Sequence, residues 1–392
     1  MKKLITLVLL ALLCLGLLLY NFSLRPIQPP TPTEPEPEQT TTPTGPSIPA
    51  AGQVRILNTD PQRQEAWEAL AEAYTAQTGT DVQILTAADD AQPTLFTVSG
   101  PEELAQVKGQ CLDLSATEAY AQLASWDLAL AEDGKVCAIA AEIEAFGLIY
   151  NSSLLGYVAT QSEITGLASL TTVAQTITAD SEMDFAAFAC PDLEGEFAAR
   201  LASVGADCRA FWDLYSANAA CAPETLAETR GANSLKELLE GKAVFYLGST
   251  DDYDRVADLG DHKLGILPLY LGGENELRQG LCVAATGYWC VRSDAPEQDI
   301  EETLAFLDYL VKPGKDGTVP VDDLQLMAPY RQATYAANPL ERTLRSDLAA
   351  GKEYVVCPKR SAVPAGLADA LAAYAADPTD DHWAAVTALL SN

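Results

Sequence analysis

VRILNTDPQRQEAWEALAEAYTAQTGTDVQIL, residues 54–85, has the pattern of a strand, a helix and a second strand. Asp60 followed by Pro61 favours a helix start, because aspartate caps the first backbone N–H groups and proline fits the first helical position. Gly79 is typical of a helix end, since glycine adopts the left-handed conformation without steric cost. Strands joined by a crossover helix are parallel and lie in a sheet that is covered on both faces. The stretch therefore predicts an α/β fold.

The same alternation of strand-like and helix-like segments continues along the chain. The predicted strands are residues 93–98, 138–150, 243–247 and 263–269, and the predicted helices are residues 101–109, 234–240 and 299–311, with two alanine-rich helices in 366–390. In the helix at 299–311, the residues predicted to share the buried face are Ile300, Leu304, Leu307 and Val311.

The length and the charge of the chain restrict its architecture and its partners. Of 392 residues, about the first fifty do not look globular, and the remaining length is too great for one compact core, so two domains are expected. The 24 basic and 55 acidic residues give a net charge of -31, which repels phosphate backbones. We therefore expect no nucleic-acid partner.

Residues 1–23 have the composition of an export signal or a membrane anchor. Two lysines precede an apolar run that reaches Phe22, and at about 1.5 Å per helical residue this run just spans a hydrocarbon core of about 30 Å. We expect an uncleaved transmembrane anchor. The alternatives are a cleaved signal and a lipid on Cys14, since LALLC resembles a bacterial lipobox, although Leu13 stands where a small residue is expected. Either anchored form puts the bulk of the chain outside the cytoplasm.

Residues 24–52 are expected to form a linker. They hold nine prolines among threonine, glutamate and glutamine, a composition that buries no core and favours the extended polyproline II conformation. The segment predicts a stiff tether between the anchor and the folded part.

The cysteines and histidines exclude several kinds of chemistry. Eight cysteines follow the anchor, which permits up to four disulfides in an exported domain or a set of small buried side chains, and the sequence assigns no pairing. With no C-x-x-C and only His262 and His382, we expect no metal, no cofactor and no histidine-based catalysis. Nucleotide-binding and hydrolase signatures are also absent from the sequence, and no pair of carboxylates can be singled out as glycosidase-like. An enzyme is not expected.

Six segments, in this order, resemble the extracellular solute-binding proteins of carbohydrate ABC transporters, the group that includes the maltose-binding protein. They are residues 54–84, 93–101 (PTLFTVSGP), 128–155 (LALAEDGKVCAIAAEIEAFGLIYNSSLL), 238–249 (LLEGKAVFYLGS), 287–311 (GYWCVRSDAPEQDIEETLAFLDYLV) and 327–333 (MAPYRQA). Together they extend over most of residues 53–392.

This resemblance implies two α/β lobes with a hinge and a solute cleft between them, the periplasmic-binding-protein-like fold. Lobe 1 is expected to comprise residues 53–145 with 281–330, and lobe 2 residues 146–280 with 331–392. The stretch from Glu144 to Asn151 would then cross from the first lobe to the second. The expected partners are a small solute and the permease subunits of an ABC importer, with the binding protein itself a monomer.

The resemblance also places candidate solute contacts. The family's contact in the first strand-helix loop falls on Asp60, where helix capping is the alternative role, and its hinge glutamate falls on Glu144, where a surface acid is the alternative. Ser99 and Gly100 come after the second strand, at a place where members of the family again contact their solute, so the resemblance makes them candidates as well.

The aromatic positions depart from the maltose-type pattern. The tryptophan expected in lobe 2 lines up with Thr250, which is followed by Asp251, and a later aromatic lines up with Pro364. Sugar binders stack rings on aromatic faces, so Trp289 and Tyr330 are the remaining aromatic candidates, with a core position as the alternative for Trp289. A maltodextrin ligand is therefore not favoured.

The leading interpretation is an extracytoplasmic binding protein that delivers a small solute, with a carbohydrate preferred, to a membrane permease. A cationic solute such as a polyamine is the alternative, because the candidate contacts are rich in carboxylates. A surface-anchored sensor or adhesion module that keeps the fold is the third.

Overall fold

The computed structural model describes residues 52–86, 91–230, 234–273, 276–358 and 363–390. The predicted anchor, Cys14 and the linker up to residue 51 lie outside these ranges. Within them, no helix has both the length and the apolar character needed to cross a membrane.

The opening strand–helix–strand unit is confirmed. It comprises β1 (Gln53–Leu57), the 3₁₀ turn η1 (Pro61–Arg63), α2 (Gln64–Thr78) and β2 (Asp81–Leu85). The side chain of Asp60 accepts a hydrogen bond from the Gln62 backbone N–H at 2.9 Å, and Gly79 ends α2 with φ of 82°. β1 and β2 pair in parallel, as the crossover helix requires.

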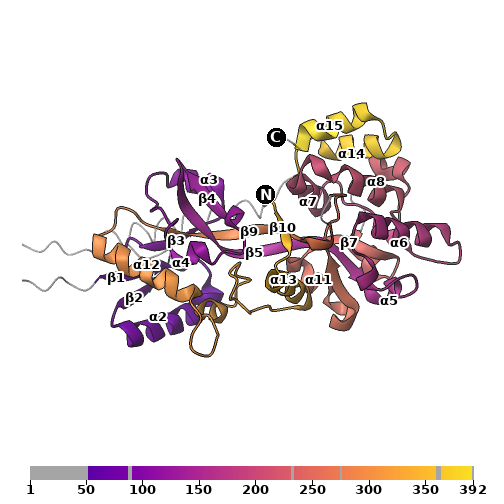
Figure 1. Cartoon of the computed structure of the whole chain (residues 1–392). Coiled ribbons are helices and arrows are strands. Elements are labelled where there is room, and N and C mark those ends of the chain that lie inside the picture. Colours follow the sequence, from indigo (N-terminus) through magenta and orange to yellow (C-terminus); the bar gives the residue numbers. More distant parts are fainter. Residues whose placement is uncertain (1–51, 87–90, 231–233, 274–275, 359–362, 391–392) are drawn as a thin grey trace, which may run out of the picture. The chain divides into compact units, whose positions relative to one another are not determined.

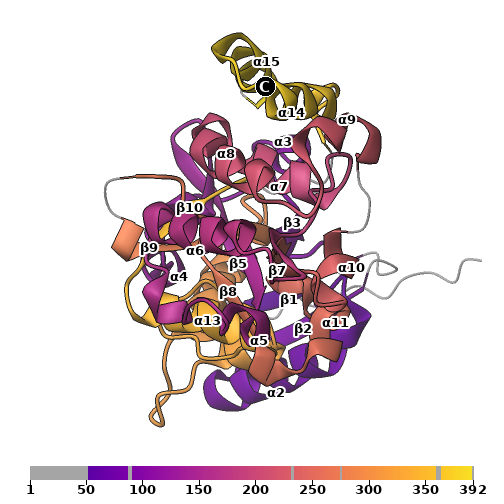
Figure 2. The same ribbon diagram turned by 90° about the vertical axis from the view of Figure 1, so that its right-hand side faces the viewer.

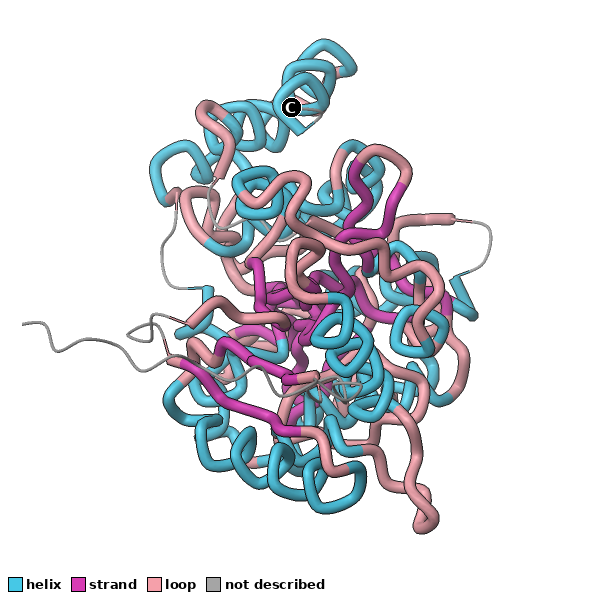
Figure 3. The backbone as a smooth tube through the Cα atoms, turned by 90° about the vertical axis from the view of Figure 1, so that its left-hand side faces the viewer, coloured by secondary structure: helices cyan, strands magenta, loops and turns pink. Residues whose placement is uncertain are grey.

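The strands of the described ranges form one mixed sheet with the central order β2-β1-β3-β9-β5-β7-β6, while β4 and β8 pair with β5, and β10 pairs with β9. The other strands are β3 (Leu95–Val98), β4 (Ala129–Glu132), β5 (Lys135–Asn151), β6 (Ala186–Phe188), β7 (Ala243–Ser249), β8 (Leu264–Leu267), β9 (Gln279–Val291) and β10 (Glu353–Val356). The predicted strands are thus confirmed, and Figure 3 shows a group of strands in the middle of the molecule with helices on either side.

The remaining α-helices are α3 (Pro101–Gln106), α4 (Glu118–Ala121), α5 (Ser152–Leu155), α6 (Leu167–Ala179), α7 (Glu196–Val204), α8 (Arg209–Ala217), α9 (Leu226–Thr229), α10 (Ser234–Leu239), α11 (Tyr253–Val256), α12 (Glu297–Val311), α13 (Pro339–Ala349), α14 (Leu367–Ala376) and α15 (Asp380–Leu390). The two alanine-rich C-terminal helices are α14 and α15, which lie beside each other next to α8 and α9 (Figure 2).

Helix α12 differs from its prediction in one respect. Its fully buried apolar stripe is Phe306, Leu307, Leu310 and Val311, whereas Ile300 and Leu304 are half-buried. The face is rotated because Asp299 is also turned inward, where it forms an ion pair with Arg55 at 2.9 Å.

Strand β5 connects the two ends of the sheet by changing its neighbours. Residues 139–146 pair with β9, residues 146–150 pair with β7, and residues 148–151 pair with β8 where the β9 ladder has ended. Figure 1 shows β5 and β9 running side by side from the group of β1, β3 and α12 to the group of β7 and α6.

Separate hydrophobic clusters cover the two ends. Helices α2 and α12 pack on β1 and β3 around Trp67, Trp289 and Phe306, while α6, α7, α8, α14 and α15 pack around Phe188 and Trp212 at the other end. A third cluster, with Ile143, Val283 and Met327, lies under the middle of β5 and β9. The sheet is thus continuous while its side-chain cores are divided.

One disulfide joins Cys190 to Cys221. The other cysteines in the described ranges are buried thiols, namely Cys111, Cys137, Cys208, Cys282, Cys290 and Cys357.

Gly147 allows the close approach of β8 to β5. A Cβ atom at this position would overlap the backbone oxygen of Leu267, an atom that no side-chain rotation can move. We predict that Gly147→Ala lowers the free energy of unfolding by about 1–3 kcal/mol, the usual range for overpacking, in urea titrations. Gly100→Ala is the matched control, since open space surrounds that Cβ position. Equal stability of both variants would contradict this packing.

Candidate functional site

Three chain segments meet where β5 leaves its first group of neighbours. Strand β5 pairs with β9 here, with Glu144 opposite Ala284, and the Ile143 backbone N–H donates to the Met327 oxygen at 3.0 Å. Across the next residues, the Ala145 N–H donates to the Thr250 hydroxyl oxygen at 3.1 Å. Strand β5, strand β9 and the segment at Met327 form the crossing region, and they connect the two ends of the molecule.

The alternation of side chains on β5 divides the crossing region into a packed face and a polar face. Ile143 and Ala145 enter the central hydrophobic cluster. Glu142 and Glu144, at the intervening positions, are only half-buried, because neighbouring residues of a strand point to opposite faces. The polar face therefore presents two carboxylates from the strand that joins the ends.

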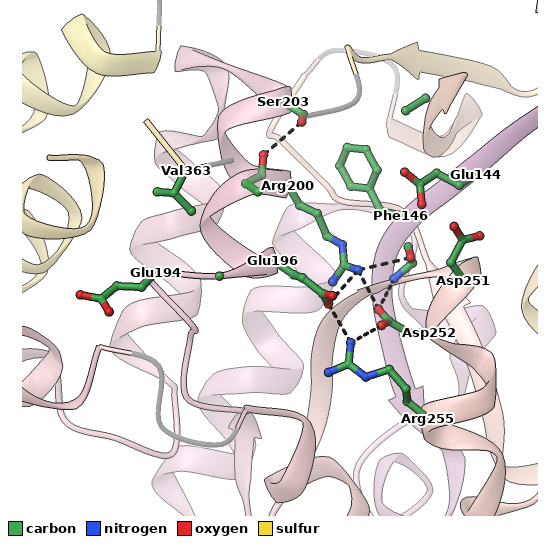
Figure 4. A pocket seen from close by; sticks show the side chains of 14 residues that line it. Glu144, Phe146, Glu194, Glu196, Arg200, Ser203, Asp251, Asp252, Arg255 and Val363 are labelled. Atoms are coloured by element: carbon green, nitrogen blue, oxygen red, sulfur yellow. Dashed lines mark hydrogen bonds and ion pairs between the residues drawn. The ribbon is translucent and has the colours of Figure 1, made fainter. Parts of the chain in front are cut away.

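A cavity of about 540 Å³, here the Glu144 cavity, opens on one side of these carboxylates. It is lined by Glu144, Phe146, Glu194, Gly195, Glu196, Ala199, Arg200, Ser203, Ser249, Asp251, Asp252, Arg255, Ala284 and Val363. Figure 4 shows Glu144, Phe146 and Asp251 on one side of the cavity, beside the arginines. The wall comes from the crossing strands, from the start of α7 and from the turn that follows β7.

An ion network stiffens this wall. Arg200 contacts Asp252 at 2.8 Å and Glu196 at 3.2 Å, while Arg255 contacts the same two carboxylates at 2.6 and 2.8 Å. Asp252 is buried and also accepts the Ser249 backbone N–H at 2.9 Å. Burial lowers the pKa of Arg200, but the neighbouring Asp252 charge leaves it raised overall, so this arginine stays charged. The network is largely satisfied within itself and fixes the floor of the cavity.

A smaller cavity of about 180 Å³, here the Asp60 cavity, lies further along the same strands, beside β1 and β3. Its polar edge is an ion triad in which Arg63 lies 3.0 Å from both Asp60 and Glu142. Trp67 and Trp289 form its apolar base. Both cavities thus reach the same two crossing strands, one through Glu142 and one through Glu144.

Glu341, in the first turn of α13, is close enough to acids of both cavities to be affected by their charges. Burial raises the pKa of this carboxyl group, and the charges of Asp251 and Glu142 raise it further. Asp251 lines the Glu144 cavity and Glu142 lines the Asp60 cavity, so Glu341 lies within electrostatic range of acids from both cavities.

The structure brings some of the predicted contacts together. Glu144 and Asp251 line the Glu144 cavity, and Asp60 lines the Asp60 cavity. Asp60 also caps η1. Ser99 and Gly100 line neither cavity, and the backbone N–H and hydroxyl of Ser99 donate to Glu103 at 2.7 and 2.8 Å, which stabilises the start of α3.

The two aromatic candidates lie in the core. Trp289 is 2% exposed and contacts the rings of Trp67 and Tyr330 with centroids at 6.5 and 6.0 Å. Tyr330 is fully buried, and its hydroxyl donates to the Ala140 backbone oxygen at 2.8 Å. In this conformation Tyr330 offers no surface to a solute, and Trp289 reaches one only as part of the apolar base of the Asp60 cavity.

Sequence reasoning did not select Arg63, Arg200, Arg255 or Glu341. A local signal existed for two of them, because Arg63 lies three residues after Asp60 and Arg200 lies four residues after Glu196, the spacings at which helical charges meet. The arrangement as a whole offers hydrogen-bonding and charged groups to a polar solute. Across the described ranges, no cluster of three or more metal-binding side chains occurs.

Comparisons with known proteins agree with this geometry. A family model described as bacterial extracellular solute-binding protein matches residues 50–318. No curated protein sequence matches the chain significantly. A family 1 extracellular solute-binding protein from Bifidobacterium longum subsp. infantis has a TM-score of 0.60 at 11% identity, over 87% of this chain and 98% of its own.

Two further solved structures are similar. The cyclic alpha-maltosyl-1,6-maltose binding protein of Arthrobacter globiformis has a TM-score of 0.59 at 12% identity, over 88% of this chain and 100% of its own. The bacterial solute receptor AcbH, described as having an exclusive preference for β-D-galactopyranose, has a TM-score of 0.59 at 11% identity, over 87% and 98%. The predicted two-lobed α/β fold is thereby confirmed.

The hydroxyl of Tyr330 supplies a testable contribution to stability. We predict that Tyr330→Phe lowers the free energy of unfolding by about 1 kcal/mol or more, because the Ala140 oxygen then loses its buried donor. Tyr157→Phe, at a side chain that is 74% exposed, is the control and should change little. Chemical denaturation of both variants measures the difference, and an unchanged Tyr330→Phe protein would argue against the core assignment.

Proposed function

Because the chain belongs to the bacterial extracellular solute-binding proteins, we propose that it captures a small polar solute in the crossing region and delivers it to an ABC permease. The observation that carries the proposal is the convergence of two cavities on the Glu142 and Glu144 face of β5. Proteins of this family are generally non-enzymatic, and the proposed function includes no bond-breaking step. An anchor in residues 1–23, either a transmembrane helix or a lipid on Cys14, would hold the protein near its permease. The protein would act as a monomer.

The proposed lobes follow the division of the hydrophobic cores. Lobe 1 would comprise residues 53–145 with 281–330, and lobe 2 residues 146–280 with 331–392. Trp289 and Phe306 pack in the first core, and Phe188 and Trp212 in the second. Since few segments join the two, bending of the crossing region would bring the Asp60 and Glu144 cavities together around the solute.

A carbohydrate is the preferred solute class. Sugar hydroxyls are held by planar charged groups, which the cavities supply as Glu144, Asp251 and the Arg63 triad. The solved structures named above for maltosyl sugars and β-D-galactopyranose have the same fold. Phe146 is the single aromatic side chain among the described lining of the Glu144 cavity, which favours a short saccharide over a long stacked chain.

A cationic solute is the second candidate, and one observation favours it. Glu144 and Asp251 line the Glu144 cavity, whereas its arginines, Arg200 and Arg255, are paired with Asp252 and Glu196. An ammonium group placed beside these two carboxylates would form charge-assisted hydrogen bonds, and its binding would be sensitive to salt.

We predict that Glu144→Gln and Asp251→Asn each weaken solute binding about 10-fold to 100-fold, the effect of losing one charge-assisted hydrogen bond. A thermal-shift panel of monosaccharides, short oligosaccharides and polyamines identifies the solute, because a ligand that binds the folded state raises Tm. Isothermal titration calorimetry then measures Kd for each variant. Glu240→Gln, on the exposed turn before β7, is the matched control.

The salt dependence separates the two solute classes. For a sugar, Kd should change little between low and high salt, whereas for a polyamine it should rise steeply. Unchanged affinity in both amide variants, with a solute that does bind, would remove this site from the proposal.

A further inference from the structure

Cys111 and Cys290 lie together on one face of the sheet. An isolated antiparallel bridge pairs Cys111 with Arg292, and the Leu112 N–H donates to the Val291 oxygen at 2.8 Å. Cys290, on β9, is two residues before Arg292, which follows the strand, so it shares that residue's face and is the diagonal neighbour of Cys111. Both thiols are buried in one hydrophobic cluster, and each is the largest influence on the pKa of the other.

Cys282 and Cys357 repeat this arrangement at the other end of β9. Strand β10 pairs in parallel with β9, Val355 opposite Cys282, and the Cys357 N–H donates to the Val283 oxygen at 2.8 Å. Cys357 is two residues beyond Val355 and therefore faces the same side as Cys282. These thiols are also buried in one hydrophobic cluster, and each is the largest influence on the pKa of the other.

The family of this chain is extracellular, where thiols in contact are normally oxidised. We propose that Cys111–Cys290 and Cys282–Cys357 are disulfides in the exported protein, in addition to Cys190–Cys221. Each pair would give up two protons and two electrons to a disulfide-bearing thiol oxidant of the extracytoplasmic space. The S–S bond of that oxidant is cleaved to two thiols as the bond in the protein forms.

The other two cysteines are expected to remain thiols. Burial raises the pKa of Cys208 to about 12, and no cysteine contributes to that shift. Cys137 lies in the cluster of Cys111, but burial is the main cause of its raised pKa, and Cys111 influences it only through charge. The largest influence on the pKa of Cys111 comes from Cys290.

The two bonds would fasten β9 on both sides of the crossing region. Cys290 joins the strand to the segment after α3, and Cys282 joins it to β10, from which the chain continues to α14 and α15. Residues 283–289, between the two bonds, include the stretch that pairs with Glu144. The disulfides would thus stiffen the two ends of β9 and leave its middle able to bend.

Peptide mapping of the full chain, exported into an oxidising compartment, tests the proposal. The protein is denatured without reductant at mildly acidic pH with N-ethylmaleimide, which blocks thiol exchange, and is then digested with trypsin. No lysine or arginine separates Cys282 from Cys290, so both lie in the peptide 279–292. We expect peptides 109–135, 279–292 and 353–359 in one species that reductant separates. Cleavage after Trp289 by chymotrypsin then assigns each bond.

Two variants sharpen the result. Cys111→Ser should release 109–135 and leave 279–292 joined to 353–359, while Cys208→Ser, the matched control, should leave the three-peptide species intact. Recovery of wild-type 109–135 and 353–359 as maleimide adducts, or of 109–135 joined to the Cys137 peptide 136–200, would overturn the assignment. The wild-type map decides the matter even where a variant does not fold.

Discussion

The antiparallel ladder between β5 and β9 is the interaction on which the rest of the structure depends. It pairs residues 139–146 with 282–289 and is continued by β7 and β8 after it ends. One face of the ladder packs on Ile143 and Val283, and the other presents Glu142 and Glu144. Hinge and binding surface are therefore two faces of the same strands, and any bend of the ladder moves the walls of both cavities.

Ion pairs hold several of the charged side chains beside this ladder. In the Glu144 cavity, Arg200 and Arg255 are occupied by Asp252 and Glu196, which makes that part of the wall rigid before a solute arrives. Burial is the main cause of the raised pKa of Glu341, and Glu142 near it is paired with Arg63 at 3.0 Å. Walls whose ion pairs are already formed suit capture of a polar solute, because those side chains need not be ordered when the solute binds.

Local rules predicted the elements well, and tertiary pairing explains what they missed. The cap at Asp60 and the left-handed Gly79 are short-range effects, and both were correct. The rotated face of α12 depends on Arg55, 244 residues from Asp299, and no helical periodicity contains that contact. Likewise, Tyr330 is an aromatic residue of the type that stacks on sugars. Its hydroxyl, however, donates a hydrogen bond to the oxygen of Ala140, 190 residues away in the sequence, and the ring lies in the core.

The central claim is that the two lobes close over a solute by bending the β5–β9 ladder. Small-angle X-ray scattering tests it most directly, with the radius of gyration of the full chain measured alone and with saturating concentrations of the solute found by thermal shift. The account predicts a smaller radius of gyration with solute bound, because hinge closure draws the lobes together. A solute that binds in the Glu144 cavity while the radius of gyration stays the same would contradict it.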